Sequence, residues 1–140
     1  MAAFGELIVI YDILPELAEK LTKALDEAVR KAAFDIQATA QAAAPVDTGF
    51  LKNSIYVVTD NGQSTYGAIQ EPTDGQEALP EVEPPKRHQA TVAVAANYGV
   101  YVEFGSAHGP AQPYLTPAVA LVAPQFLAAL EKMEALMEAV

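Results

Sequence analysis

Hydrophobic residues recur at helical spacing in the first third of the chain. From Leu17 to Ala43 they return every three or four positions, and charged residues occupy the remaining faces of the same stretch. This pattern predicts an amphipathic helix of roughly thirty residues. Pro15 suits the first turn of this helix, because the N–H that proline lacks is unpaired there in any case, and Pro45 ends it.

A second helix is predicted near the C-terminus. Thr116 followed by Pro117 is a typical start signal, with the threonine as N-cap and the proline in the first turn. We expect Pro124 to kink or weaken the helix. Its apolar stripe comprises Val119, Val122, Phe126, Leu130, Met133 and Met137.

Short segments outside the helices alternate apolar and polar residues. Strands are predicted at Leu7–Ile13, Ser54–Asp60, Ser64–Ile69 and Gln89–Ala96, and Asn61-Gly62 is a hairpin signal between the second and the third. Tyr98–Gly105 fits either a strand or a helical turn, and the pattern leaves both open. The fold class predicted is α+β, with a small antiparallel sheet packed with a long N-terminal helix and a C-terminal helix.

The chain of 140 residues is predicted to form a single domain, residues 1–140. Residues 70–86 form an acidic, Pro-rich loop without periodicity, and loops of this length are usually functional or disordered. The loop is either a solvated surface segment or a docking arm for a basic partner. The second interpretation would make the protein an acidic adaptor that binds a basic partner through this loop.

Composition excludes several classes of function. The formal net charge of −10 argues against a general phosphate-binding surface and against anionic membranes. The chain contains no cysteine, so disulfides, thiolate metal sites and cysteine nucleophiles are excluded. No apolar run reaches the ~20 residues of a membrane helix. The N-terminus lacks a basic region, so we expect no signal peptide.

Catalytic motifs are sparse. Asp47-Thr48-Gly49 has the sequence of a small dimeric aspartic protease, but it follows an Ala-rich helix and a proline rather than an apolar strand. A homodimeric aspartic-type hydrolase centred on Asp47 therefore stays an alternative, and a turn-capping role for Asp47 is favoured. His88 and His108 lack motif context and are interpreted as solvent-facing loop histidines. We predict no catalytic residues, cofactor or metal.

The aromatic residues Tyr98, Tyr101 and Phe104 could form a stacking platform for single-stranded nucleic acid. Such a platform needs a basic groove, whereas the neighbouring residue here is Glu103. Packing in the core or at a subunit contact is the better interpretation of these three side chains.

Three motifs follow one another along the chain. The first comprises Pro45, Asp47, Thr48, Gly49, Leu51 and Ser54; the second comprises Tyr98, Tyr101, Glu103, Phe104 and Gly105; the third comprises Gln112, Pro113, Leu115, Pro117 and Ala118. In this order they resemble the motifs of the phage tail-component family of head–tail joining, or neck, proteins. The chain departs mildly from that pattern, with Gly99 for the usual alanine, Ser106 for threonine and Tyr114 for phenylalanine.

The resemblance implies a structural, non-enzymatic virion protein that forms a ring at the head–tail junction and completes the tail. It implies a homo-oligomer, expected to be a hexamer, whose partners are other neck, head-completion and tail-tube or tail-terminator proteins. DNA would pass through the ring without specific binding, because carboxylates and phosphates repel. The location would be the neck or tail of the virion, assembled in the host cytoplasm.

The motif residues are then expected to act as scaffold. Asp47 would cap a turn, Gly49 and Gly105 would permit tight backbone paths, and Pro113 and Pro117 would fix the entry to the last helix. Glu103 is expected to be buried and paired with a backbone donor or with Lys52.

Overall fold

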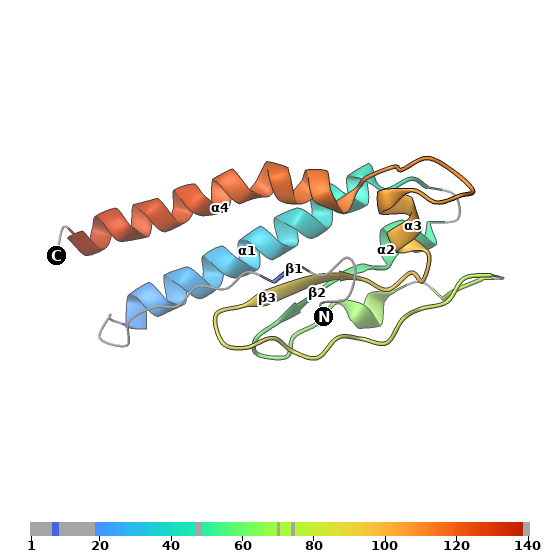
Figure 1. The fold of residues 1–140 in the computed structure, drawn as a ribbon. Coiled ribbons are helices and arrows are strands. Elements are labelled where there is room, and N and C mark those ends of the chain that lie inside the picture. The colour runs from blue at the N-terminus through green and yellow to red at the C-terminus, as the bar shows by residue number, and fades with distance from the viewer. Residues whose placement is uncertain (1–6, 9–18, 47–48, 70, 74, 139–140) are drawn as a thin grey trace.

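The computed structural model describes residues 7–8, 19–46, 49–69, 71–73 and 75–138 (Figure 1). It confirms the α+β class and both long helices. The elements in chain order are β1 (Leu7–Ile8), α1 (Glu19–Ala43), α2 (Phe50–Asn53), β2 (Ile55–Thr59), a short 3-10 helix η1 (Tyr66–Ala68), β3 (Ala90–Val94), α3 (Gly99–Phe104) and α4 (Leu115–Glu138).

The two long helices pack against each other and run in opposite directions, with α1 between α4 and the sheet (Figure 1). The core forms where the apolar stripe of α1 meets one face of β2 and β3. On the α1 side it contains Leu25, Val29, Ala33, Ile36 and Ala40, each no more than 2 % exposed. Several of the buried α1 residues are alanines, so neighbouring elements can approach the backbone of α1 closely. α4 adds Ala118 and Val122 to the same core.

The described strands form an antiparallel sheet in the order β1-β3-β2. Val57 of β2 pairs with Val92 of β3, which also pairs with Leu7 of β1. Every residue of β2 and β3 is buried, so both faces of these strands are covered. The helices cover one face, and a second apolar cluster around Tyr56, Val58, Ala93 and Ala95 lies on the other.

The described part of the acidic loop covers that second face. Val82 packs on the cluster, and its backbone N–H donates to the hydroxyl of Tyr56 at 3.0 Å. The N–H of Leu79 donates to the carbonyl of Ala95 at 2.7 Å, and the hydroxyl of Tyr66 donates to the carbonyl of Leu79 at 2.6 Å. The loop is therefore part of the packed structure, while Glu71, Glu77, Glu81 and Glu83 point their acidic side chains into solvent.

The outer edge of β2 is closed by local hydrogen bonds. The N–H of Val57 donates to the Thr65 hydroxyl at 2.9 Å, and the N–H of Thr65 donates to the Val57 carbonyl at 3.0 Å. The Gln37 side chain donates to the carbonyl of Ile55 at 3.0 Å, and the N–H of Thr59 donates to the carbonyl of Gln63 at 2.9 Å. These partners leave little of this edge open for another strand.

Some sequence expectations need correction. The strand predicted at Ser64–Ile69 is wrong, because after one bridge between Ser64 and Val58 the chain turns into η1. Tyr98–Gly105, for which the sequence left a strand and a helical turn open, contains the helix α3. The helix α4 continues through Pro124, and the kink or weakening expected there stays a prediction. Of the predicted first strand, residues 9–13 lie outside the described residues, and so does the predicted first turn of the first helix at Pro15.

Candidate functional site

The three motifs meet at one end of the molecule, where α2 and α3 lie beside the first turn of α4 (Figure 1). We call the described residues of the three motifs, within 45–54, 98–105 and 112–118, the motif corner. Phe50 and Tyr98 place their rings 6.2 Å apart, which joins the first segment to the second. The N–H of Gln112 donates to the carbonyl of Val102 at 2.8 Å, which joins the second to the third. Asp47 and Thr48 lie outside the described residues.

Glu103 is the centre of this corner. Among the described residues it is the only buried charged side chain, at 3 % exposure. One carboxylate oxygen accepts the N–H groups of Tyr114 at 3.0 Å and Leu115 at 2.8 Å, and the other accepts the N–H of Thr116 at 3.1 Å. These donors stand at the start of α4, which leaves its first N–H groups unpaired and favours a negative charge. Glu103 therefore caps α4.

The cap differs from the sequence prediction in the residue that provides it. The sequence predicts Thr116 as the N-cap, but α4 already begins at Leu115, and the carboxylate of Glu103 takes the capping role. Of the two partners expected for Glu103, the backbone donors are correct, whereas Lys52 is exposed and is not one of the bonded partners. Pro117 lies in the first turn of α4, where its missing N–H removes no helical hydrogen bond.

The pKa of Glu103 reflects this environment. Burial alone would raise the pKa of the carboxyl, but the hydrogen bonds from Leu115, Tyr114 and Thr116 outweigh it and hold the pKa below its usual range. Glu103 is thus ionised at neutral pH, with its charge shared among backbone donors.

Tyr114 and Gly99 fit together closely. The Tyr114 side chain is fully buried, and its hydroxyl donates to the carbonyl of Gly99 at 3.1 Å. A Cβ atom added at Gly99 would lie 2.9 Å from that hydroxyl and 2.9 Å from a methyl group of Val94. The absence of a side chain at Gly99 therefore makes room for the hydroxyl of Tyr114. Burial and the nearby charge of Glu103 raise the pKa of Tyr114, so the hydroxyl stays protonated.

Two motif glycines and a serine shape the turns of the corner. Gly49 and Gly105 both have positive φ, 85° and 84°. A Cβ atom at Gly105 would also lie 2.9 Å from the backbone nitrogen of Ala111. The Ser54 hydroxyl donates to the carbonyl of Leu51 at 2.8 Å and ends α2. These contacts agree with the tight backbone paths expected at Gly49 and Gly105.

An open groove of about 530 Å³ runs along this corner. Pro45, Leu51, Tyr98, Tyr101 and Gln112 from the motif segments line it, together with residues of the acidic loop and of the loop before α4: Thr73, Gly75, Gln76, Ser106, His108 and Pro110. The rings of Tyr101 and Phe104 are 60 % and 67 % exposed. Pro113 is exposed as well. The corner thus buries its capping groups and presents aromatic side chains outward.

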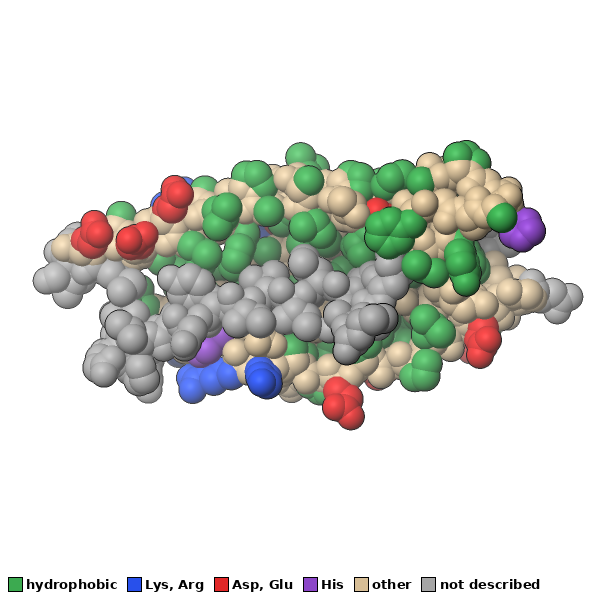
Figure 2. All heavy atoms as spheres, in the orientation of Figure 1, with side chains coloured by type: hydrophobic (Ala, Val, Ile, Leu, Met, Phe, Trp, Pro, Cys, Tyr) green, Lys and Arg blue, Asp and Glu red, His purple; other side chains and the backbone are tan. Residues whose placement is uncertain are grey.

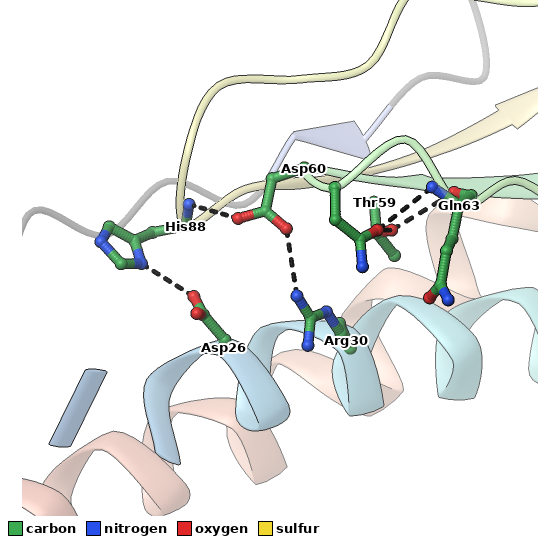
Figure 3. Close-up of polar contacts among 7 residues, drawn as sticks. Asp26, Arg30, Thr59, Asp60, Gln63 and His88 are labelled. Atoms are coloured by element: carbon green, nitrogen blue, oxygen red, sulfur yellow. Dashed lines mark hydrogen bonds and ion pairs between the residues drawn. The ribbon is translucent and has the colours of Figure 1, made fainter. Parts of the chain in front are cut away.

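A second polar cluster links α1 to the far ends of β2 and β3 (Figure 3). We call Asp26, Arg30, Asp60 and His88 the polar tie. The Nδ1 atom of His88 lies 2.8 Å from an oxygen of Asp26, and the N–H of His88 donates to Asp60 at 3.0 Å. The guanidinium of Arg30 contacts Asp60 at 3.3 Å. These groups pair with one another, although the buried Nε atom of Arg30 has no hydrogen-bond partner, and the pairing favours a structural role for the cluster.

The polar tie was not predicted from the sequence. His88 is half-buried and paired, so its assignment as a solvent-facing histidine is wrong, whereas His108 is exposed as expected. A weak signal was available, because Asp26 and Arg30 are four residues apart and so share one side of α1. Burial would raise the pKa of Asp60, but the His88 N–H and the Arg30 guanidinium lower it below its usual range.

The described residues contain no group of three or more histidine and acidic side chains placed to hold a metal ion. No helix in the described part of the chain combines the length and apolar character needed to cross a membrane. The geometry of the motif corner, a buried carboxylate bonded to backbone N–H groups, is that of a scaffold which orders a helix and displays a surface.

The chain belongs to the HK97-gp10-like family. The family model, described as "Bacteriophage HK97-gp10, putative tail-component", matches residues 10–105. No curated protein and no solved structure matches the chain significantly. Membership makes the protein a structural component of a phage tail, located in the virion, and favours a structural over an enzymatic role. The match ends at Gly105, so the third motif lies beyond it and is joined to the second through Glu103.

Proposed function

We propose that this tail component forms a ring at the junction of head and tail, completes the tail and joins it to the head, and leaves a channel for DNA. The expected ring is a hexamer. Its neighbours would be other neck and head-completion proteins on one side and tail-tube or tail-terminator proteins on the other. The same proposal places the protein in the neck of the virion after assembly in the host cytoplasm.

The observation that carries the proposal is the surface of α4. From Leu115 to Leu130 the helix contains no charged residue. Its outer side nevertheless faces solvent in the isolated chain, with Leu121 60 % and Leu127 57 % exposed. Figure 2 shows hydrophobic side chains along the helix and acidic ones at its C-terminal end. A helix without charged residues on any side is normally buried. The exposed apolar side chains of α4 therefore favour an assembly that covers them.

The charge of the chain supports a channel. The net charge is −10, and the described acidic residues of the loop all point into solvent. If such side chains face the lumen of a ring, they repel the phosphates of DNA and prevent it from adhering. The exposed rings of Tyr101 and Phe104 supply a second, separate apolar surface, suited to a contact with a neighbouring ring.

The proposal is tested by measuring the mass of the purified protein by light scattering, alone and after addition to tails that lack it. We expect either a mass of six times the 14.8 kDa subunit or incorporation into the tails, with restored joining to heads. A stable dimer that ignores tails would contradict the proposal.

An Asp47→Asn variant separates the proposal from a hydrolase centred on Asp47. A catalytic carboxylate cannot be replaced by an amide without loss of activity. A residue that caps a turn tolerates the change, because asparagine is an equally good cap. We therefore expect the variant to restore joining of tails to heads as well as the unchanged protein does. A folded variant that fails to join them would favour catalysis.

A further inference from the structure

α1 exposes a narrow line of side chains along its length. Between Leu21 and Ala42 the exposed residues are Lys23, Glu27, Lys31, Phe34, Ala38 and Ala42. Their spacing of three or four places them on one face of the helix. We call these six residues the α1 stripe. Its first half is charged and its second half is apolar, with Phe34 43 % exposed.

α4 exposes a line of matching length. Its apolar part comprises Pro117, Ala120, Leu121, Pro124, Leu127 and Ala128, and its acidic part comprises Glu131, Glu134 and Glu138, all exposed. We call these nine residues the α4 stripe. Lys132 lies beside the acidic part and is exposed as well. The order of the two halves is the reverse of that in α1, because the apolar half comes first.

From this reversed order we propose that the α4 stripe of one copy packs antiparallel on the α1 stripe of the next copy. One register places the apolar half of each stripe on the apolar half of the other and the charged half on the charged half. In this register Pro124 lies opposite Ala38 of the neighbour, and Glu131 lies opposite Lys31. The apolar halves then bury Leu121, Leu127 and Phe34 together. At ~1.5 Å per residue the two stripes have similar lengths of roughly 30 Å. The pairing repeats, between copies, the antiparallel contact of α1 and α4 within one chain.

Charge identifies the partner as a second copy. Two copies that each carry −10 repel, except where uncharged surfaces meet or where basic side chains face acidic ones. The two stripes provide both conditions, because Lys23 and Lys31 face the acidic part of the α4 stripe on either side of Glu27, which adds one like charge, and these lysines are two of only eight lysine and arginine residues in the chain. Because the stripes are different surfaces, the contact is heterologous and can repeat around a ring. The inference thus deepens the proposed ring and rests on it.

Cross-linking tests the contact directly, because the chain contains no cysteine of its own. Two single variants, Ala38→Cys and Leu121→Cys, are mixed, assembled on tails that lack the protein and treated with a short bismaleimide. We expect cross-linked dimers from the mixture and none from either variant alone. The matched control is Ala68→Cys, an exposed alanine of η1 away from both stripes, which should give no product with Leu121→Cys.

A charge exchange tests the register. Lys31→Glu and Glu131→Lys should each weaken self-association or incorporation about five- to tenfold, and the double variant should restore most of it. Lys31 also pairs with Asp35 of its own helix at 2.5 Å, so the stability of the single chain is measured in parallel. Lys86→Glu, an exposed charge reversal outside both stripes and the motif corner, is the control and should change association little.

The outcomes distinguish the inference from the proposed function. Cross-linking of Leu121→Cys with itself would show a two-fold α4 contact and overturn the heterologous pairing. Normal incorporation and joining without any stripe cross-link would overturn the inference and leave the ring proposal standing. A protein that forms the stripe cross-links in free solution but never enters tails would support the contact between the stripes. The same result would contradict the proposed function.

Discussion

The motif corner and the polar tie stabilise the fold by different means. In the corner, one buried carboxylate accepts three backbone N–H groups from a segment only 11 to 13 positions away. In the tie, side chains from α1 and the strand ends bond mainly to one another across 28 to 62 positions and stay partly exposed. Backbone donors cannot move away from a lost partner, whereas exposed side chains can turn to water. The corner should therefore be the more costly of the two to disturb.

The largest effect is expected for Glu103→Ala. The variant leaves three N–H groups at the start of α4 without their acceptor inside the protein, and we expect a loss of about 3 kcal/mol in unfolding free energy. Denaturant titration measures it. Glu83→Ala removes an exposed glutamate and should change stability by a few tenths of a kcal/mol at most. Equal stability of the two variants would refute the capping role.

A smaller loss, about 2 kcal/mol, is expected for Gly105→Ala. The residue has φ of 84°, which side chains rarely adopt, and the added Cβ would lie 2.9 Å from the backbone of Ala111. Gly109→Ala in the same loop is the matched control, because nothing lies within 4 Å of its added Cβ. In thermal melts, the melting temperature of Gly105→Ala should lie clearly below that of Gly109→Ala. Coincident curves would mean that the loop adjusts freely.

The fit of Gly99 and Tyr114 is tested by a double-mutant cycle. Gly99→Ala places a methyl group 2.9 Å from the Tyr114 hydroxyl, and we expect a cost of about 1–2 kcal/mol. Tyr114→Phe removes the hydroxyl, so Gly99→Ala should cost less in that background, with the contact to Val94 remaining. The coupling energy from denaturant titration of the four proteins should be about 1 kcal/mol. Strict additivity would contradict the fit.

The smallest effect is expected in the tie, for Asp60→Asn, at about 1 kcal/mol near neutral pH. The pKa of Asp60 is lowered in the folded protein, so its stabilisation is complete above the ordinary pKa of about 4 and is lost as the pH falls through the lowered value. The variant lacks this contribution. Its stability, measured by denaturant titration at several pH values, should therefore fall less steeply below pH ~4 than that of the unchanged protein.

The sequence predicted the parts of the fold that local patterns determine. The spacing of Leu25, Val29 and Ile36 predicts α1 because one face must be apolar to pack on the sheet. Turn signals around Pro117 and Asn61-Gly62 mark the start of α4 and the turn after β2. The resemblance to a phage family connected the three motifs with one another, and it led to the expectation that Glu103 is buried.

What could not be predicted depends on contacts between distant residues. His88 looks like an isolated loop histidine because its partner, Asp26, lies 62 positions earlier. The strand expected at Ser64–Ile69 fails because Thr65 satisfies the edge of β2 with its hydroxyl and backbone, and the chain then turns away. The acidic composition of the loop gives no sign that Val82 packs on the sheet. Pattern rules consider one segment at a time.

The closed edge of β2 has a consequence for how copies recognise one another. An open strand accepts any extended chain, because backbone hydrogen bonding is indifferent to sequence, and such edges lead to fibrillar growth. With Gln37, Gln63 and Thr65 bonded along this edge, that indiscriminate route is blocked there. Recognition at this side is left to side chains, whose shape and charge differ from one protein to the next. Because little of this edge is open, a neighbouring chain at this side is selected by its side chains rather than by backbone pairing.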